Sequence, residues 1–289
     1  MPVERDVARS FWHRPSLALH GFAITALLFV YVAVRVFWWY DSASPDWWRD
    51  SALQVVLDND IADGVFKLLA WAGACTIVVA WLHRASPRCA WRILGFTRDA
   101  HHGVRFGLVA TLPLAVAVLT TGAHAQNAGV VIGTALLGPF AEEVLFRGFL
   151  FRELHQHARW PLGWAIGVSA LAFGFAHVPH LDVLAFDAMR YYAYPYVARE
   201  FNAAMAQVAM MTAGGVVFAW VCQRAGSLWP AIALHGFINF WLTLSTSATR
   251  SGIHVDVVGL AQSVSFVLAL VLTARWRPAR PIASPARLS

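Results

Sequence analysis

The chain has 289 residues, of which 58% are apolar and only 13% are Asp, Glu, Lys or Arg. A soluble domain carries roughly a quarter charged residues, so this composition excludes a disordered chain, a nucleic-acid-binding domain and an ordinary soluble enzyme. The mean hydropathy of +0.55 indicates an integral membrane protein surrounded by the lipid bilayer. The meaning of the net charge of +6 therefore depends on where along the chain the basic residues lie.

Eight apolar runs approach the length of about 20 residues that a helix needs to cross a bilayer. They predict an all-α polytopic membrane protein with about eight transmembrane helices. The predicted spans are Leu17–Tyr40, Gly64–Leu82, Gly103–Thr121, Ala128–Phe151, Leu162–Val178, Ala203–Cys222, Ser227–Ser245 and Val255–Ala274.

The basic residues are distributed unevenly between the two sides of these spans. The two tails and the even-numbered loops hold 15 of the 22 Lys and Arg residues, whereas the alternate loops hold four. Basic residues are retained in the cytoplasm, so we predict a multi-pass cell-membrane protein with both termini cytoplasmic. Cys75 and Cys222 lie in apolar runs and are expected to be small buried side chains.

Two acidic residues, Glu142 and Glu143, lie deep in an apolar run, where ionisable groups are functional candidates. Gly138-Pro139 is expected to break the span and place both carboxylates in the first turn of a new helix, where the dipole favours negative charge. Glu143 and Arg147 are four positions apart on one helix face, which favours an ion pair. Glu142 points about 100° away and is available to a water molecule. A purely structural charge network of all three is the alternative.

Two later spans each carry isolated polar residues. The fifth ends at His177, shortly before Pro179; taken alone, such a histidine is more often packed than catalytic. The seventh carries His235 and Asn239 on one helix face, with Gly236 allowing a close backbone approach. An interhelical hydrogen-bond pair is the alternative for His235 and Asn239.

Together these residues form an inventory for hydrolysing an amide bond without a side-chain nucleophile. A carboxylate with a histidine can activate water as a general base, and a histidine with an asparagine can donate hydrogen bonds to the developing oxyanion. The sequence has no HExxH, GxSxG, Gly-Asp, P-loop or GxGxxG motif, which disfavours zinc, serine and aspartyl proteases and nucleotide use.

The segment Arg152–Trp160 places His155 and His157 close to Glu153 and could be mistaken for a metal cluster. Histidines two positions apart do not share a helix face. We therefore predict that this segment is a basic end of a span, near anionic lipid headgroups.

Three motifs follow one another on successive parts of the chain, and in this order they resemble the motifs of the CPBP family. This family comprises the CAAX-prenyl-protease-like and bacteriocin-processing (ABI) membrane proteases and includes the type II CAAX endopeptidases. The matching motifs are Glu142-Glu143-xxx-Arg147, Phe173-xxx-His177 and His235-xxx-Asn239. EExxxR alone would be weak, but the ordered triple is specific.

The resemblance implies an eight-helix intramembrane endopeptidase in which Glu142 is the base and His177 positions the water. It implies that His235 and Asn239 form the oxyanion site, and it agrees with the ion pair inferred from spacing. No cofactor is expected, although two carboxylates with two histidines leave a divalent metal such as zinc open. The expected partners are a membrane-associated peptide or protein substrate and the lipid bilayer, with no nucleic acid and no nucleotide.

The predicted organisation has three parts: an N-terminal three-helix membrane region (1–127), a protease core (128–245) with the site on spans four, five and seven, and a C-terminal helix with a basic cytoplasmic tail (246–289). The tyrosine-rich stretch Leu181–Asn202 is expected to be an interfacial anchor, with a substrate lid as the alternative. A non-catalytic scaffold or immunity factor of the same family and a proton-coupled transporter are the competing functions.

Overall fold

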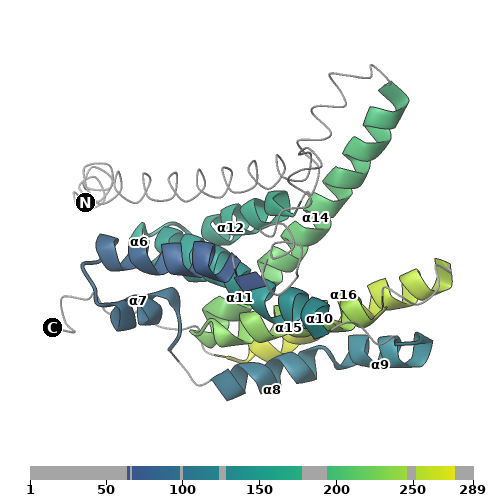
Figure 1. Ribbon diagram of the computed structural model, residues 1–289, viewed down its shortest axis with the longest axis horizontal. Helices are drawn as coiled ribbons and strands as arrows, with labels where there is room; N and C mark the ends of the chain where they lie inside the picture. Colours follow the sequence, from purple (N-terminus) through teal and green to yellow (C-terminus); the bar gives the residue numbers. More distant parts are fainter. Residues whose placement is uncertain are drawn as a thin grey trace, which may run out of the picture.

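The computed structural model describes residues 64–65, 67–97, 100–123, 128–177, 194–245 and 252–276, and all regular structure among them is helical (Figure 1). This confirms the predicted all-α class. The helices, with π-helical segments labelled η, are η1 (Leu68–Gly73), α6 (Ala74–Leu82), α7 (Pro87–Leu94), α8 (Ala100–Ala110), α9 (Leu112–Thr121), α10 (Ala128–Val131), η2 (Ile132–Leu137), α11 (Gly138–Glu143), η3 (Val144–Phe151), η4 (Glu153–His157), α12 (Leu162–Ala176), α14 (Tyr194–Ala225), α15 (Trp229–Ser245) and α16 (Gly252–Ala274).

Two helical stretches, Met205–Ala225 and Val257–Ala274, are long and apolar enough to cross a membrane. The helices before and after the turn between α6 and α7 bend by 105°, and α8 and α9 bend by 53°; each pair qualifies if it forms one span. The described residues thus provide two to four candidate spans. The predicted span Leu17–Tyr40 and residues 181–193 lie outside the described part, so the total of eight and the assignment of the site to spans four, five and seven stay predictions.

Large apolar side chains point outward from several described helices. Leu69, Ile77, Trp164 and Leu260 are each more than 65% exposed, which would be costly in water and is ordinary where lipid tails surround the helix. Together with the apolar helices, these faces identify a membrane protein. Other aromatic and aliphatic side chains point inward and form a buried core between the helices.

The helices pack in pairs that are distant in the sequence. In the described residues, α12 lies along α14, α8 along α15, and α9 along α16 (Figure 1). Small residues allow the closest of these contacts: a Cβ atom on Gly107 of α8 would lie 2.8 Å from the carbonyl carbon of Ala233 on α15. Backbones therefore approach closely at α8 and α15, as is common between helices in membranes.

The stretch from α10 to η3 runs through Gly138-Pro139 without a break, so the predicted break is wrong. Leu137 and Gly138 both have helical backbone angles, and Glu142 and Glu143 occupy the last two positions of α11 rather than its first turn. Pro139 lies where π-type hydrogen bonding gives way to α-type bonding, so its missing N–H coincides with a change of pattern. The two carboxylates consequently depend on neighbouring side chains, not on a helix dipole.

Candidate active site

Glu142 lies between two histidines that come from different helices. Its Oε2 atom is 3.2 Å from Nε2 of His177, at the end of α12, and 3.8 Å from Nε2 of His235 on α15. The side chain of Glu142 keeps 14% of its surface exposed, and that of His177 keeps 24%. The structure thus brings the carboxylate and both histidines together at a place that remains accessible from outside the core.

Glu143 is fully enclosed and contacts a different set of partners. Nη1 of Arg147 donates a hydrogen bond of 3.1 Å to its Oε1, and Nδ1 of His235 lies 3.0 Å from the same oxygen. Neither Glu143 nor Arg147 has any exposed side-chain surface. The carboxylate therefore joins the predicted ion pair to His235, a link that the sequence spacing could not reveal.

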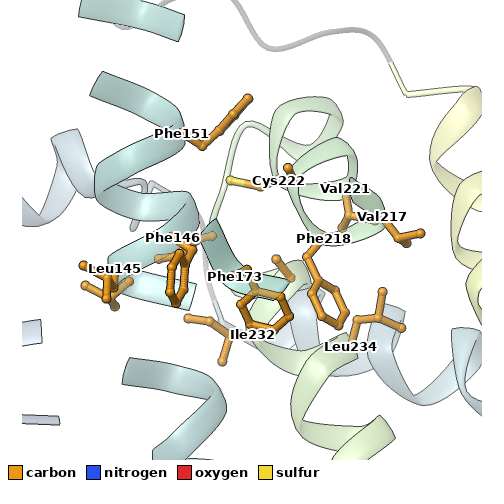
Figure 2. Close-up of a cluster of buried hydrophobic side chains, with 14 of the residues drawn as sticks. Leu145, Phe146, Phe151, Phe173, Val217, Phe218, Val221, Cys222, Ile232 and Leu234 are labelled. Carbon is orange, nitrogen blue, oxygen red and sulfur yellow. The ribbon is translucent and has the colours of Figure 1, made fainter. Parts of the chain in front are cut away.

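Aromatic rings surround this buried pair. The guanidinium carbon of Arg147 lies 4.1 Å from the ring centre of Phe173 and 5.2 Å from that of Phe218, within the range of cation–π attraction. The ring of Phe218 also stacks on His235 at 4.8 Å and 18°. Figure 2 shows Phe146, Phe173 and Phe218 in a row, with Phe173 in the middle. Gly215 leaves room for the guanidinium, because a Cβ atom there would lie 3.1 Å from Nη2 of Arg147.

The backbone fixes which nitrogen of His177 faces Glu142. Nδ1 lies 2.8 Å from the carbonyl oxygen of Phe173, and a carbonyl can only accept, so Nδ1 carries a proton. Nε2 is then directed at the carboxylate of Glu142, whose Oε2 lies 3.2 Å away. The side chain of Gln207 donates to the carbonyl of His177 at 2.8 Å and holds this end of α12 in place.

The same argument applies to His235. Oε1 of Glu143 accepts a hydrogen bond from Nη1 of Arg147, and a carboxylate oxygen is an acceptor, so Nδ1 of His235 donates its proton to the same oxygen. Nε2 of His235 faces the reactive side of the cluster. Because Nδ1 carries a proton, Nε2 can donate a hydrogen bond there only when the ring is protonated on both nitrogens.

Asn239 lies one helical turn beyond His235 on α15. Its Nδ2 donates a 3.0 Å hydrogen bond to the carbonyl of Thr134 in η2, which leaves the second N–H of the amide for another acceptor. Gly236 permits this approach: a Cβ atom there would lie 2.6 Å from the carbonyl oxygen of Ala135. The close approach expected at Gly236 is thus made by a helix of the same chain.

Several residues around the site were not singled out from the sequence. Phe218 and Gly215 of α14 shape the pocket of Arg147, and Gln207 holds His177. Lys67, the single lysine of the chain, interacts electrostatically with Glu142. A lysine close to an apolar run is unusual, and this signal could have identified Lys67 from the sequence. Nothing comparable in a single sequence distinguishes Phe218, Gly215 or Gln207.

The types and spacing of the ligand atoms bear on whether this site could hold a metal ion. Glu142, His177 and His235 offer a carboxylate oxygen and two Nε2 atoms, which are suitable ligand types for zinc. Among the described residues, however, the three-residue group whose ligand atoms come close enough together to share an ion lies elsewhere, at His83, Glu153 and His157. The two histidines around Glu142 approach its Oε2 through Nε2, at 3.2 Å and 3.8 Å.

Comparison with known families gives a match for the part of the chain that contains this site. Residues 124–241 match the family described as Rce1-like, type II CAAX prenyl endopeptidase Rce1-like. Searches among curated proteins and solved structures found no match. The matched segment includes all six predicted site residues, and it confirms the resemblance to the CAAX-type membrane proteases.

Proposed function

We propose that this chain, whose residues 124–241 are a Rce1-like domain of the CAAX-type intramembrane protease family, hydrolyses a peptide bond of a membrane-associated protein or peptide. The observation that carries the proposal is the division of labour between two adjacent carboxylates. Glu143 is fully buried and paired with Arg147, whereas the side chain of Glu142 is partly exposed and lies 3.2 Å from His177. Only Glu142 can meet both a water molecule and a substrate.

In the proposed reaction, Glu142 accepts a proton from a water molecule bound beside its carboxylate and oriented by His177. The resulting hydroxide attacks the carbonyl carbon of the scissile amide, and the carbonyl oxygen becomes negatively charged. His235, protonated on both nitrogens, and the free N–H of Asn239 donate hydrogen bonds to that oxyanion. Glu142 then passes its proton to the leaving nitrogen, the C–N bond breaks, and the carboxylate is regenerated.

Glu143 and Arg147 act as positioning residues in this scheme. The carboxylate of Glu143 fixes the ring of His235 through Nδ1, and Arg147 balances its charge. No step requires a metal, because the base, the proton donor and the oxyanion donors are all side chains. The glutamic-type mechanism is our proposal; the family match supports the protease class.

Glu142→Gln is the decisive variant. It keeps the volume and polarity of the side chain but removes the base, so cleavage should fall by at least a factor of 100 while the melting temperature stays close to that of the unaltered protein. The assay uses full-length protein in detergent with two peptides, one carrying a farnesylated cysteine and one anchored by an apolar helix. His102→Gln, at an exposed histidine of α8, is the control and should retain full activity.

The two substrates separate the remaining alternatives. Cleavage of the prenylated peptide alone indicates a CAAX-type substrate, and cleavage of the helix-anchored peptide indicates a broader membrane substrate. If Glu142→Gln cleaves as fast as the unaltered protein, the assigned mechanism is wrong. If the unaltered protein cleaves neither peptide, membrane proteomics compares cells that express the unaltered protein with cells that express Glu142→Gln. If no precursor accumulates in the Glu142→Gln cells either, a scaffold or transporter function would replace the protease function.

A further inference from the structure

A second cluster of histidine and carboxylate side chains lies away from Glu142. Nε2 of His83 is 2.7 Å from Oε1 of Glu153, and Nδ1 of His157 is 3.5 Å from Oε2 of the same carboxylate. The two imidazole rings lie 4.3 Å apart with an angle of 50° between their planes. One ligand atom from each residue lies within 4.8 Å of the other two.

Glu153 and His157 lie four positions apart in η4, and His83 follows the last residue of α6. His155, which lies between them, faces elsewhere: its Nδ1 contacts the carbonyl of Trp160 at 3.0 Å. The spacing of His155 and His157 argued against a metal cluster, because these two residues do not share a helix face. The ligand that completes the set, His83, lies 70 positions before Glu153 in the sequence.

The expected lipid-facing character of Arg152–Trp160 is contradicted at its first residues. Arg152 and Glu153 are only 2% and 1% exposed, and Nη2 of Arg152 is directed at Sγ of Cys222, 3.7 Å away. Burial of a carboxylate is costly unless a positive charge compensates it. Two imidazoles lie against Glu153, and they can help balance its charge as fellow ligands of a cation.

We propose that His83, Glu153 and His157 form a zinc-binding site that joins the α6–α7 turn to the helix carrying the active site. Two imidazoles and a carboxylate are a common three-residue zinc set, with a fourth position left for water. Tetrahedral zinc ligands lie roughly 3.4 Å apart. Nδ1 of His157 lies 3.5 Å from Oε2 of Glu153 and Nε2 of His83 lies 2.7 Å from Oε1, so each imidazole already faces one oxygen of the carboxylate at close to ligand spacing. His157 retains 22% side-chain exposure, which gives the ion an entry path.

The site would have a structural consequence for the rest of the molecule. α6 and α7 meet at a sharp bend, and a bound ion would fasten this bend to η4. The helical stretch from Gly138 to His157 would then be held at both ends, by Glu143 and Arg147 in the core and by the ion near its last turn. The inference does not rest on the proposed protease function.

The test is direct metal binding by the full-length protein, purified in detergent through an affinity tag without histidine and stripped with a chelator. Zinc titration should give one tight equivalent per chain, raise the melting temperature measured by tryptophan fluorescence, and be matched by cobalt(II) binding with the visible absorption of a tetrahedral site. His157→Ala should weaken binding at least tenfold and abolish the thermal shift. His157→Asp, which keeps a ligand, should retain cobalt absorption with lower affinity.

Two further variants make the outcome specific. His102→Ala, which removes an exposed histidine of α8, and His177→Ala, which removes a histidine at Glu142, should both keep the tight equivalent. The proposal is overturned if His157→Ala and Glu153→Gln bind zinc as the unaltered protein does, or if His177→Ala alone removes the ion. Absence of binding at tens of micromolar zinc would overturn it as well. If His157→Ala does not fold, His157→Asp and Glu153→Gln decide the question.

Discussion

Replacing Arg147 with methionine should destabilise the protein strongly. The substitution keeps an apolar side chain between Phe173 and Phe218 but leaves the carboxylate of Glu143 buried without its cation. Removing one partner of a buried pair costs about 3–5 kcal/mol, and the lost cation–π contact adds about 1 kcal/mol. With roughly 2–4 °C per kcal/mol for a domain of this size, the melting temperature should fall by about 10 °C or more.

The chain contains a convenient reporter for this measurement. Cys75 and Cys222 have no exposed surface, whereas Cys89 is partly exposed, as expected for the first two from the sequence. A thiol-reactive fluorophore should therefore label Cys89 at once and the two buried thiols only on unfolding. The temperature of half-maximal labelling gives the melting temperature in detergent.

The double variant Glu143→Gln/Arg147→Met tests the reasoning. It removes both charges and keeps an amide oxygen that can accept the proton on Nδ1 of His235. We expect it to be more stable than either single variant, by about 2 kcal/mol. Additive losses in the two single variants, or an Arg147→Met protein that melts within 2 °C of the unaltered one, would refute the coupled buried pair.

Two further predictions concern α15. Gly236→Ala should lower kcat/KM at least tenfold and reduce the melting temperature, because the new Cβ would lie 2.6 Å from the carbonyl oxygen of Ala135 and displace His235. Gly167→Ala, which has open space around its Cβ, should change neither quantity. Equal effects in both variants would contradict the steric argument. Asn239→Ala should lower kcat by about 100- to 1000-fold with little change in KM, because an oxyanion donor acts mainly in the transition state. Steady-state cleavage rates measure both constants. An unchanged kcat would show that Asn239 is not an oxyanion donor.

Local spacing in the sequence predicted local geometry well. Hydropathy predicted the all-α class, and the four-residue spacing of Glu143 and Arg147 correctly placed them on one face, where they lie 3.1 Å apart. The separation of about 100° between Glu142 and Glu143 agrees with the structure, where Glu142 contacts His177 and Glu143 pairs with Arg147, although both carboxylates also lie near His235. These successes depend on helix periodicity, which is a property of neighbouring residues.

Contacts between helices were beyond the same reasoning. The bond between His235 and Glu143 joins residues 92 positions apart, and hydropathy reports the length of an apolar run, not which polar atoms meet inside it. Burial of Glu153 was missed for the same reason, since its partner His83 belongs to another helix. The uninterrupted helix at Gly138-Pro139 was not predicted, because proline is expected to interrupt the hydrogen bonds of an α-helix. In the structure, π-type hydrogen bonding precedes Pro139 instead.

The continuity of the helical stretch from Gly138 to His157 affects how inhibition by chelators should be interpreted. This stretch supplies one glutamate to each of two histidine-containing clusters, Glu142 to the candidate active site and Glu153 to the proposed zinc site. Removal of an ion from Glu153 could loosen the stretch and slow cleavage at Glu142 without any metal in the reaction. Loss of activity in a chelator would then reflect loss of the ion that holds the helix carrying Glu142 in place. A variant lacking His157 would distinguish this structural effect from a metal that takes part in catalysis.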